Sequence, residues 1–135
     1  MKKPLLVTLI VVAILVACAK VPITGRKQMN LVNEGTLMAM ADTQYREVMR
    51  SSRLVPDNDP RARQVKQVGE KIANAATQYL NDHRLGKRVA GFQWEFRLID
   101  EPTVNAWCMP GGKVAFYTGI LPVTANDAGM AVVMG

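Results

Sequence analysis

Few residues in this sequence have side chains that could perform covalent or metal chemistry. The chain holds one histidine, His83, and two cysteines, Cys18 and Cys108. A site that needs two histidines is therefore excluded. A Ser-His-Asp triad or a Cys-His pair needs only one histidine and must be judged from its surroundings. His83 lies in the polar stretch 81–84, which is typical of an exposed loop.

Cys108 stands in an apolar setting, directly after Trp107 and before Met109. We expect a small buried side chain rather than a nucleophile, because the sequence offers only His83 as a base. A zinc site built on these two residues would need further ligands at suitable spacing, and the sequence shows none. The residue types thus predict no catalytic residue and no metal ligand in this chain.

Cys18 closes an N-terminal segment that is typical of a secretory signal. Lys2 and Lys3 precede the uncharged run 5–17, which is shorter than the roughly 20 residues that a helix needs to cross a bilayer. The run ends in Leu-Val-Ala-Cys, which resembles the bacterial lipobox. The sequence predicts cleavage before Cys18 and acyl chains on that residue. The alternative is an ordinary signal peptide that happens to contain a cysteine.

Such processing would anchor the protein to a membrane that it does not cross, because two or more acyl chains on one protein give stable membrane attachment. Ala19 after the cysteine favours the outer membrane, so we expect an exported lipoprotein that faces the periplasm. Cleavage would remove Lys2 and Lys3 and lower the formal net charge from +6 to +4, a mild positive charge that suits an anionic lipid surface. Nucleic acid is not expected as a partner, since the basic residues are spread along the chain. The sequence does not indicate an oligomeric state.

The chain is the size of one domain. At about 100–150 residues per domain, 135 residues exclude a large multidomain enzyme. Hydrophobic residues at 49% and charged residues at 21% are ordinary globular values, so a disordered chain is not expected. We expect residues 1–17 to form the signal peptide, 18–33 a tether and 34–135 the domain.

Hydrophobic periodicity predicts two helices at the start of this domain. Apolar residues recur at steps of three and four over 34–53 and again over 60–81. Asp59 is a suitable N-cap for the second helix, and Pro60 fits its first position. The charged residues off the apolar stripe of the second helix are interpreted as a solvated face.

The period then changes to two, which predicts strands. One strand is expected where four apolar residues alternate with polar ones: Phe92, Trp94, Phe96 and Leu98. We interpret its aromatic stripe as core rather than as a platform for stacking sugars or bases, because the two helices need a surface to cover. The segments 104–109 and 113–117 read as a hairpin closed by a Pro-Gly-Gly turn.

A last helix is predicted near the end of the sequence. Thr124 and Asp127 match the capping-box pattern, and the residues that follow up to Gly135 are apolar on every side. No solvated face or basic last turn is present. We therefore interpret the chain as a fragment cut within a buried helix, the alternative being a genuine terminus with a short buried helix.

Two segments together resemble a known family. Residues 21–31 (VPITGRKQMNL) follow the lipobox, and residues 105–121 (NAWCMPGGKVAFYTGIL) combine an N-A-x-x-x-P-G-G hairpin with T-G-I-L. They resemble the HtpX-like zinc metallopeptidases, in the exported lipoprotein branch that includes LoiP- and BepA-like proteins. The likeness covers essentially the whole chain after the signal segment.

The resemblance implies an α+β fold, the N-terminal half of a zincin-like (gluzincin) metallopeptidase domain. Two helices would lie on a small, mainly antiparallel sheet, followed by a truncated active-site helix. In that family the helix opening near Thr124 carries an HExxH motif, which supplies two zinc ligands and a general base. The sequence reaches Gly135 where the motif is expected, so we expect zinc in the full-length protein and none bound by this chain.

The resemblance further implies a zinc-dependent endopeptidase that acts on misfolded envelope proteins. This chain would be an N-terminal fragment of that enzyme and would be inactive alone. The alternative is a non-catalytic envelope lipoprotein that serves as a chaperone or as an assembly module. A histidine pair downstream would discriminate between the two. A cysteine-dependent enzyme that uses Cys108 is the weakest interpretation, since it requires an accessible, reactive thiol.

The hairpin suggests how this part of the chain would meet a peptide substrate. The turn residues Pro110, Gly111 and Gly112 permit a close backbone approach. In metallopeptidases of this general type an edge strand near the zinc pairs with extended substrate. We therefore expect the hairpin strand that begins with Lys113, Val114 and Ala115 to bind substrate by strand addition, the alternative being a purely structural hairpin.

Overall fold

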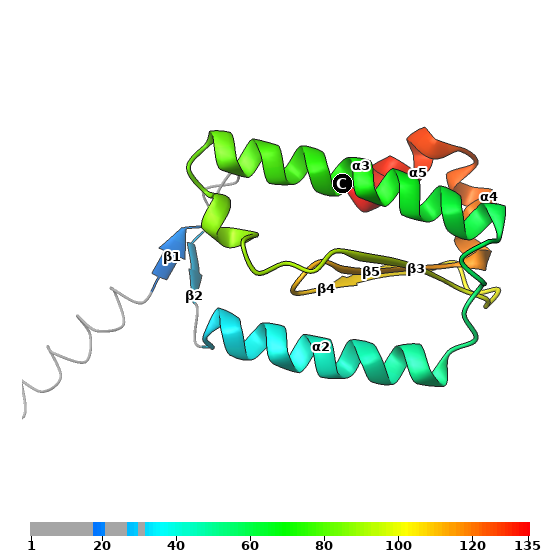
Figure 1. The fold of residues 1–135 in the computed structure, drawn as a ribbon, viewed down its shortest axis with the longest axis horizontal. Helices are drawn as coiled ribbons and strands as arrows, with labels where there is room; N and C mark the ends of the chain where they lie inside the picture. The colour runs from blue at the N-terminus through cyan, green and yellow to red at the C-terminus, as the bar shows by residue number, and fades with distance from the viewer. Residues whose placement is uncertain (1–17, 21–26, 30–31) are drawn as a thin grey trace, which may run out of the picture. The chain divides into compact units, whose positions relative to one another are not determined.

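A computed structural model describes residues 18–20, 27–29 and 32–135 of the chain (Figure 1). The chain divides into two units, Met1–Thr36 and Leu37–Gly135. In the first unit, β1 (Cys18–Lys20) pairs antiparallel with β2 (Lys27–Met29). The predicted signal peptide and the rest of the predicted tether lie outside the described residues, so those boundaries stay predictions.

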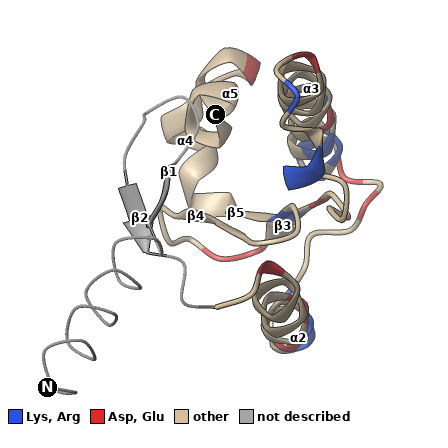
Figure 2. Ribbon diagram, turned by 90° about the vertical axis from the view of Figure 1, so that its left-hand side faces the viewer, with Lys and Arg blue, Asp and Glu red and all other residues tan. Residues whose placement is uncertain are grey.

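The second unit has a small sheet with helices on both of its faces, as Figures 1 and 2 show. Most of α2 (Glu34–Ser51) lies on one face, whereas α3 (Pro60–Asp82) and α5 (Asp127–Met134) lie on the other. Three short elements connect these layers: η1 (Gly86–Arg88), η2 (Thr118–Ile120) and α4 (Leu121–Thr124). The predicted α+β fold is confirmed. None of the described helices is both long and apolar enough to cross a membrane.

The sheet is mixed rather than mainly antiparallel. Its strands are β3 (Glu95–Ile99), β4 (Ala106–Met109) and β5 (Lys113–Tyr117), in the order β3-β5-β4. β5 pairs parallel with β3 and antiparallel with β4, because the hairpin returns the chain between the two earlier strands. The expectation of a mainly antiparallel sheet was therefore wrong, and β5 is the central strand.

The pleat of the sheet separates an apolar face from one that mixes apolar and charged side chains. Phe96 is the register partner of Val114, and Leu98 is that of Phe116. These side chains face α3 and α5 and belong to the main hydrophobic core, whose buried members are Val55, Ala62, Val65, Val68, Leu98, Phe116, Ile120 and Met130. A Cβ added to Gly69 of α3 would collide with the ring of Phe96, so the helix approaches β3 closely there.

The predicted helices form, but the expected burial of α2 is only partly observed. Ala41 and Tyr45 of α2 are buried as expected, whereas Leu37 and Met40 are exposed. The α2 side of the sheet mixes charged side chains (Glu95, Arg97 and Lys113) with apolar ones (Ile99, Ala115 and Trp107), so only part of it is apolar surface for this helix to cover.

The last helix begins later than the capping-box pattern indicated. Asn126 is its N-cap, and the Asn126 Oδ1 atom accepts a hydrogen bond from the Gly129 N–H at 3.0 Å. Thr124 ends α4 and donates its hydroxyl proton to the Leu121 carbonyl. Within α5, Met130 is buried but Val132 is 80% exposed, so only one side of this apolar helix packs against the described residues.

Asp59 caps α3 as predicted and gives a pH-dependent contribution to stability. Hydrogen bonds from the Arg61 side chain and backbone lower the pKa of the Asp59 carboxyl from 3.8 to about 2. Because the folded-state pKa is depressed, this contribution is present above about pH 4 and is lost as the pH falls through about 2. We expect Asp59→Ala to lower the urea midpoint at pH 7, with a difference from wild type that shrinks towards pH 2.

The matched control is Asp59→Asn, which keeps a capping oxygen but carries no charge. It should lose less stability than Asp59→Ala at pH 7, and its own capping contribution should not depend on pH. Urea unfolding followed by circular dichroism measures both variants. A deficit of Asp59→Ala that is unchanged between pH 7 and pH 2 would show that the carboxylate charge is not responsible.

Candidate functional site

A group of polar side chains lies between α2 and the sheet, and we call it the interlayer cluster. Its members come from α2, the α2–α3 connection, β3 and β5: Tyr45, Asp57, Glu95, Arg97 and Lys113. Glu95 and Lys113 are register partners on adjacent strands, so the sheet itself brings their side chains together. The cluster therefore depends on the parallel pairing of β3 with β5.

Lys113 is the most deeply buried charge of the interlayer cluster. Its side chain is 4% exposed, and its Nζ atom lies 2.5 Å from Oε1 of Glu95, a side chain that is 39% exposed. The same Nζ atom lies 5.4 Å from the centre of the Tyr45 ring, a favourable cation–π arrangement. One carboxylate and one aromatic face thus compensate for the removal of this ammonium group from water.

Tyr45 joins α2 to this ion pair. Its hydroxyl donates a hydrogen bond to Oε2 of Glu95 at 3.3 Å, and its ring packs edge-on against Trp107 of β4. Burial, followed by the nearby charge of Glu95, raises the pKa of Tyr45 to about 12. The phenol is therefore a neutral hydrogen-bond donor at physiological pH.

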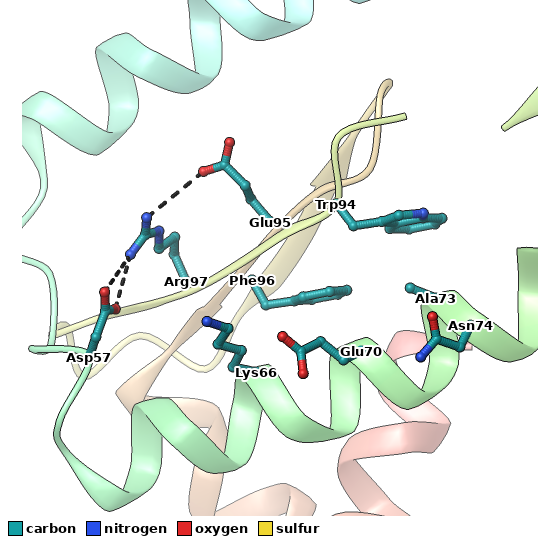
Figure 3. Close-up of a pocket in the computed structure, with 9 residues that line it drawn as sticks. All are labelled: Asp57, Lys66, Glu70, Ala73, Asn74, Trp94, Glu95, Phe96 and Arg97. Atoms are coloured by element: carbon teal, nitrogen blue, oxygen red, sulfur yellow. Dashed lines mark hydrogen bonds and ion pairs between the residues drawn. The ribbon is translucent and has the colours of Figure 1, made fainter. Parts of the chain in front are cut away.

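Arg97 extends the interlayer cluster to the connection between α2 and α3. Its Nη1 atom lies 3.0 Å from Oδ1 of Asp57, and its Nη2 atom lies 4.0 Å from Oε2 of Glu95 (Figure 3). The cluster thus ties three separate segments to β3. It contains no nucleophile with an adjacent base, so we assign it a structural role in holding the hairpin and α2 in register.

The predicted substrate-binding hairpin forms, and its turn has the expected backbone. Gly111 and Gly112 have φ angles of 90° and 84°, the left-handed region that favours glycine. A Cβ at Gly112 would also lie 2.9 Å from the ring of Trp94. Pro110 stands exposed at the start of this turn. The glycines thus allow the turn to pack closely against Trp94, whereas its approach to a substrate stays a prediction.

The strand expected to pair with substrate is corrected by the sheet order. Lys113, Val114 and Ala115 lie in β5, which is already paired on both edges, so β5 has no free edge to offer a peptide. Among the described residues no strand pairs with the outer edge of β4, so the open edge of the hairpin belongs to β4 instead. The sequence alone could not show this, because the order of strands depends on the path of the connection before β4.

The hydrogen bonding of β4 shows which of its backbone groups are free. The Tyr117 N–H donates to the Asn105 carbonyl at 3.1 Å, so these two residues face each other as a hydrogen-bonded pair. The pattern alternates along an antiparallel ladder, and Trp107 and Met109 therefore also point their backbone groups at β5. The N–H and C=O groups of Ala106 and Cys108 point away from the sheet.

The fold does not place the side chains of His83 and Cys108 in contact with each other. Cys108 is exposed on the edge strand β4, so the expectation of a buried thiol was wrong. His83 is exposed after α3, as expected, with its Nδ1 atom 2.7 Å from the Tyr79 carbonyl and its ring stacked on Tyr79. Among the described residues no hydrogen bond joins His83 to Cys108, and a cysteine-dependent reaction is not supported.

Zinc does not fit the residues at hand. No group of three His, Cys, Asp or Glu side chains that could hold a metal ion occurs in the described part of the chain. Zinc sites in proteins need three or four such ligands in tetrahedral arrangement. The described residues therefore do not form a zinc site by themselves.

Comparison with known proteins shows to which family the domain formed by α3, the sheet and α5 belongs. The sequence profile of peptidase family M48 matches residues 59–135, which span α3, the whole sheet and α5. The chain belongs to peptidase family M48. The metallopeptidase family expected from the hairpin and the segment 21–31 is therefore confirmed, although not its exported lipoprotein branch. Peptidases of this family are zinc-dependent in general.

The curated M48 relatives found are metalloendopeptidases. The chain is 29% identical over 119 residues to the mitochondrial metalloendopeptidase OMA1 of Saccharomyces cerevisiae, covering 85% of this chain and 34% of the relative. It is 34% identical over 116 residues to that of Schizosaccharomyces pombe, covering 84% of this chain and 31% of the relative. The chain thus spans about a third of the length of these two relatives.

These M48 relatives correct two expectations. They are named mitochondrial enzymes, so the assignment to the exported lipoprotein branch is not supported, and the expected location on the periplasmic side of an outer membrane is wrong. The lipid attachment at Cys18 is tested by neither the comparisons nor the structure, which describes the backbone of β1 but not its side chains. It stays a prediction.

Proposed function

We propose that this chain is the framework half of a zinc-dependent metalloendopeptidase domain, which presents the outer edge of β4 to an extended protein substrate. The observation that carries the proposal is the match of residues 59–135 to peptidase family M48. The matched residues include the whole sheet and therefore both strands of the hairpin. In a protein as long as the relatives, of which this chain covers about a third, the zinc ligands would come from the other two thirds.

The substrate class follows from the chemistry of the β4 edge. Two residues, Ala106 and Cys108, offer backbone N–H and C=O groups to a neighbouring strand. Such groups recognise any polypeptide that is locally extended, whatever its side chains. We propose that the enzyme acts on unfolded or loosely folded protein segments, which alone can lie along this edge.

A second candidate function is that of a binding module without catalysis. The β4 edge favours it, because an edge strand can hold an extended peptide without any metal. The two functions differ in one readout: both predict peptide binding at β4, but only the first predicts that the bound peptide is cut.

Cys108→Pro tests whether substrate pairs with the outer edge of β4. The variant is made in a protein that contains this chain together with the zinc-binding part of the enzyme. Proline removes the N–H that points away from the sheet and leaves the ladder with β5 intact, which is the tolerated position for proline on an edge strand. Losing one backbone hydrogen bond of about 1.4 kcal/mol should lower kcat/KM for casein about tenfold. Cleavage of fluorescent casein measures the change.

Cys108→Ala is the matched control, because it keeps the N–H and removes the thiol. It should cleave casein as wild type does, which would also exclude a role for the thiol. Thermal unfolding must show that both variants are folded. Equal cleavage by the two variants would refute substrate pairing at β4.

A further inference from the structure

A pocket of about 360 Å³ opens beside β3 and is not used by the proposed function (Figure 3). Four consecutive residues, 94–97, line it together with Glu70 and Ala73 of α3. Neighbouring residues of a strand point to opposite faces of the sheet. A pocket lined by all four must therefore reach around the outer edge of β3, on the side that β5 does not occupy.

The backbone at this edge is open for part of its length. The Glu95 N–H donates to the Gly112 carbonyl at 2.9 Å, so Glu95 and, two residues on, Arg97 direct their backbone groups at β5. The backbone groups of Trp94, Phe96 and Leu98 point outward instead. Among the described residues, no backbone hydrogen bond reaches the outward groups of Phe96.

The chain already uses the far end of this edge to hold an extended segment. The Val55 N–H donates to the Leu98 carbonyl at 2.9 Å, and the Asp100 N–H donates to the Arg53 carbonyl at 2.7 Å. Leu54 forms an antiparallel bridge with Ile99 between these two bonds. The pairing ends at Val55, and the open part of the edge begins directly beside it.

The side chains around the open part suit an apolar residue of the added strand. Trp94 is 36% exposed, and its ring lies parallel to that of Phe96, with 6.2 Å between their centres and 5° between their planes. Ala73 of α3 continues this apolar wall, and Lys66 and Glu70 flank it with opposite charges. Asp57, Glu95 and Arg97 also line the pocket, so its wall is apolar at the centre and carries three acidic and two basic side chains at the border.

We propose that the outer edge of β3 is a second peptide-binding site, which takes an extended polypeptide segment as a fourth strand of the sheet. An apolar side chain of that segment would lie against Trp94 and Phe96, and its backbone would pair with the outward groups of Phe96. The site is separate from the β4 edge and does not rest on peptidase activity. It would hold an unfolded segment of the same kind of protein at the opposite edge of the sheet.

The test uses the full 135-residue chain and a fluorescein-labelled peptide in which phenylalanine or valine alternates with threonine. Fluorescence anisotropy measures its binding. Two analogues carry backbone N-methyl groups on alternate residues. One analogue is methylated at the odd-numbered positions and the other at the even-numbered positions. A strand pairs through only one of its edges, so one analogue should bind at least about tenfold more weakly than the parent and the other should bind as the parent does.

Trp94→Ala locates the bound peptide. It should weaken binding about tenfold through the loss of apolar contact. Val123→Ala, which changes an exposed side chain on α4, should not alter binding. Because Trp94→Ala could disturb the turn at Gly112, amide hydrogen exchange of the unaltered chain gives a second readout. The peptide should slow exchange at the Phe96 amide and leave the Ala106 amide of β4 unchanged.

Three results would overturn the proposal. Equal binding of both methylated analogues would show that the peptide does not add as a strand. Slower exchange at Ala106 alone would place the peptide on β4, which would support the proposed function and not the second site. Absence of binding by the parent peptide at the solubility limit of the chain would show that the β3 edge does not accept a strand.

Discussion

Replacing Glu95 with alanine is expected to lower the free energy of unfolding by about 3 kcal/mol, near the lower end for breaking a buried ion pair. The reason is the partner that remains. The Lys113 side chain is 4% exposed and would be left buried without the carboxylate that now lies 2.5 Å from its Nζ atom. Tyr45 would also lose the acceptor of its hydroxyl. Urea unfolding at pH 7 measures the loss.

The remaining variants of a double-mutant cycle separate the ion pair from the packing around it. Lys113→Met should cost only about 1 kcal/mol, since it leaves Glu95, which is 39% exposed and can be hydrated. The double variant Glu95→Ala with Lys113→Met should be more stable than Glu95→Ala alone. A double variant that is less stable by the sum of both losses would show that the buried charge is not the cause.

Phe116→Ala is expected to cost about 3–5 kcal/mol, the usual range for a phenylalanine removed from a core. Phe116 is 1% exposed and lies on the central strand, where it is the register partner of both Leu98 and Ala106. The cavity left behind would loosen both edge strands at once. The loss is a large share of the roughly 5–15 kcal/mol that stabilises a typical domain.

Val132→Ala is the control for this prediction, because its side chain is 80% exposed on α5. It should change the free energy of unfolding by less than about 0.5 kcal/mol. Urea unfolding followed by tryptophan fluorescence compares the two variants. A loss below about 1 kcal/mol for Phe116→Ala would mean that the core closes around the missing ring and that β5 is not held by it.

The helices and the hairpin were predictable because each is determined by nearby residues. The apolar stripe and the Asp59 cap with Pro60 were enough to place α3 within one residue of its observed end. The Pro-Gly-Gly turn likewise fixed the ends of β4 and β5 to within two residues. The order of the strands was not predictable, because it depends on how residues 100–105 cross the sheet.

The surroundings of single side chains were less predictable than the helices and strands. They depend on which strands lie side by side in the sheet. Cys108 sits in an apolar sequence yet is exposed, because β4 is an edge strand rather than a central one. Lys113 sits at the start of a strand yet is buried, because parallel pairing places it beside Glu95. The one available signal for Lys113 was its position on the same face of β5 as Ala115 and Tyr117, the face opposite to Val114 and Phe116.

Zinc binding and casein cleavage, measured together on this chain and on any longer product of the same gene that contains it, test the central claim most directly. We predict that the 135-residue chain binds no zinc and does not cleave casein, and that the longer protein binds about one zinc ion per chain and is inhibited by 1,10-phenanthroline. Stoichiometric zinc or chelator-sensitive cleavage in the 135-residue chain would contradict the account. So would a longer protein that neither binds zinc nor cleaves.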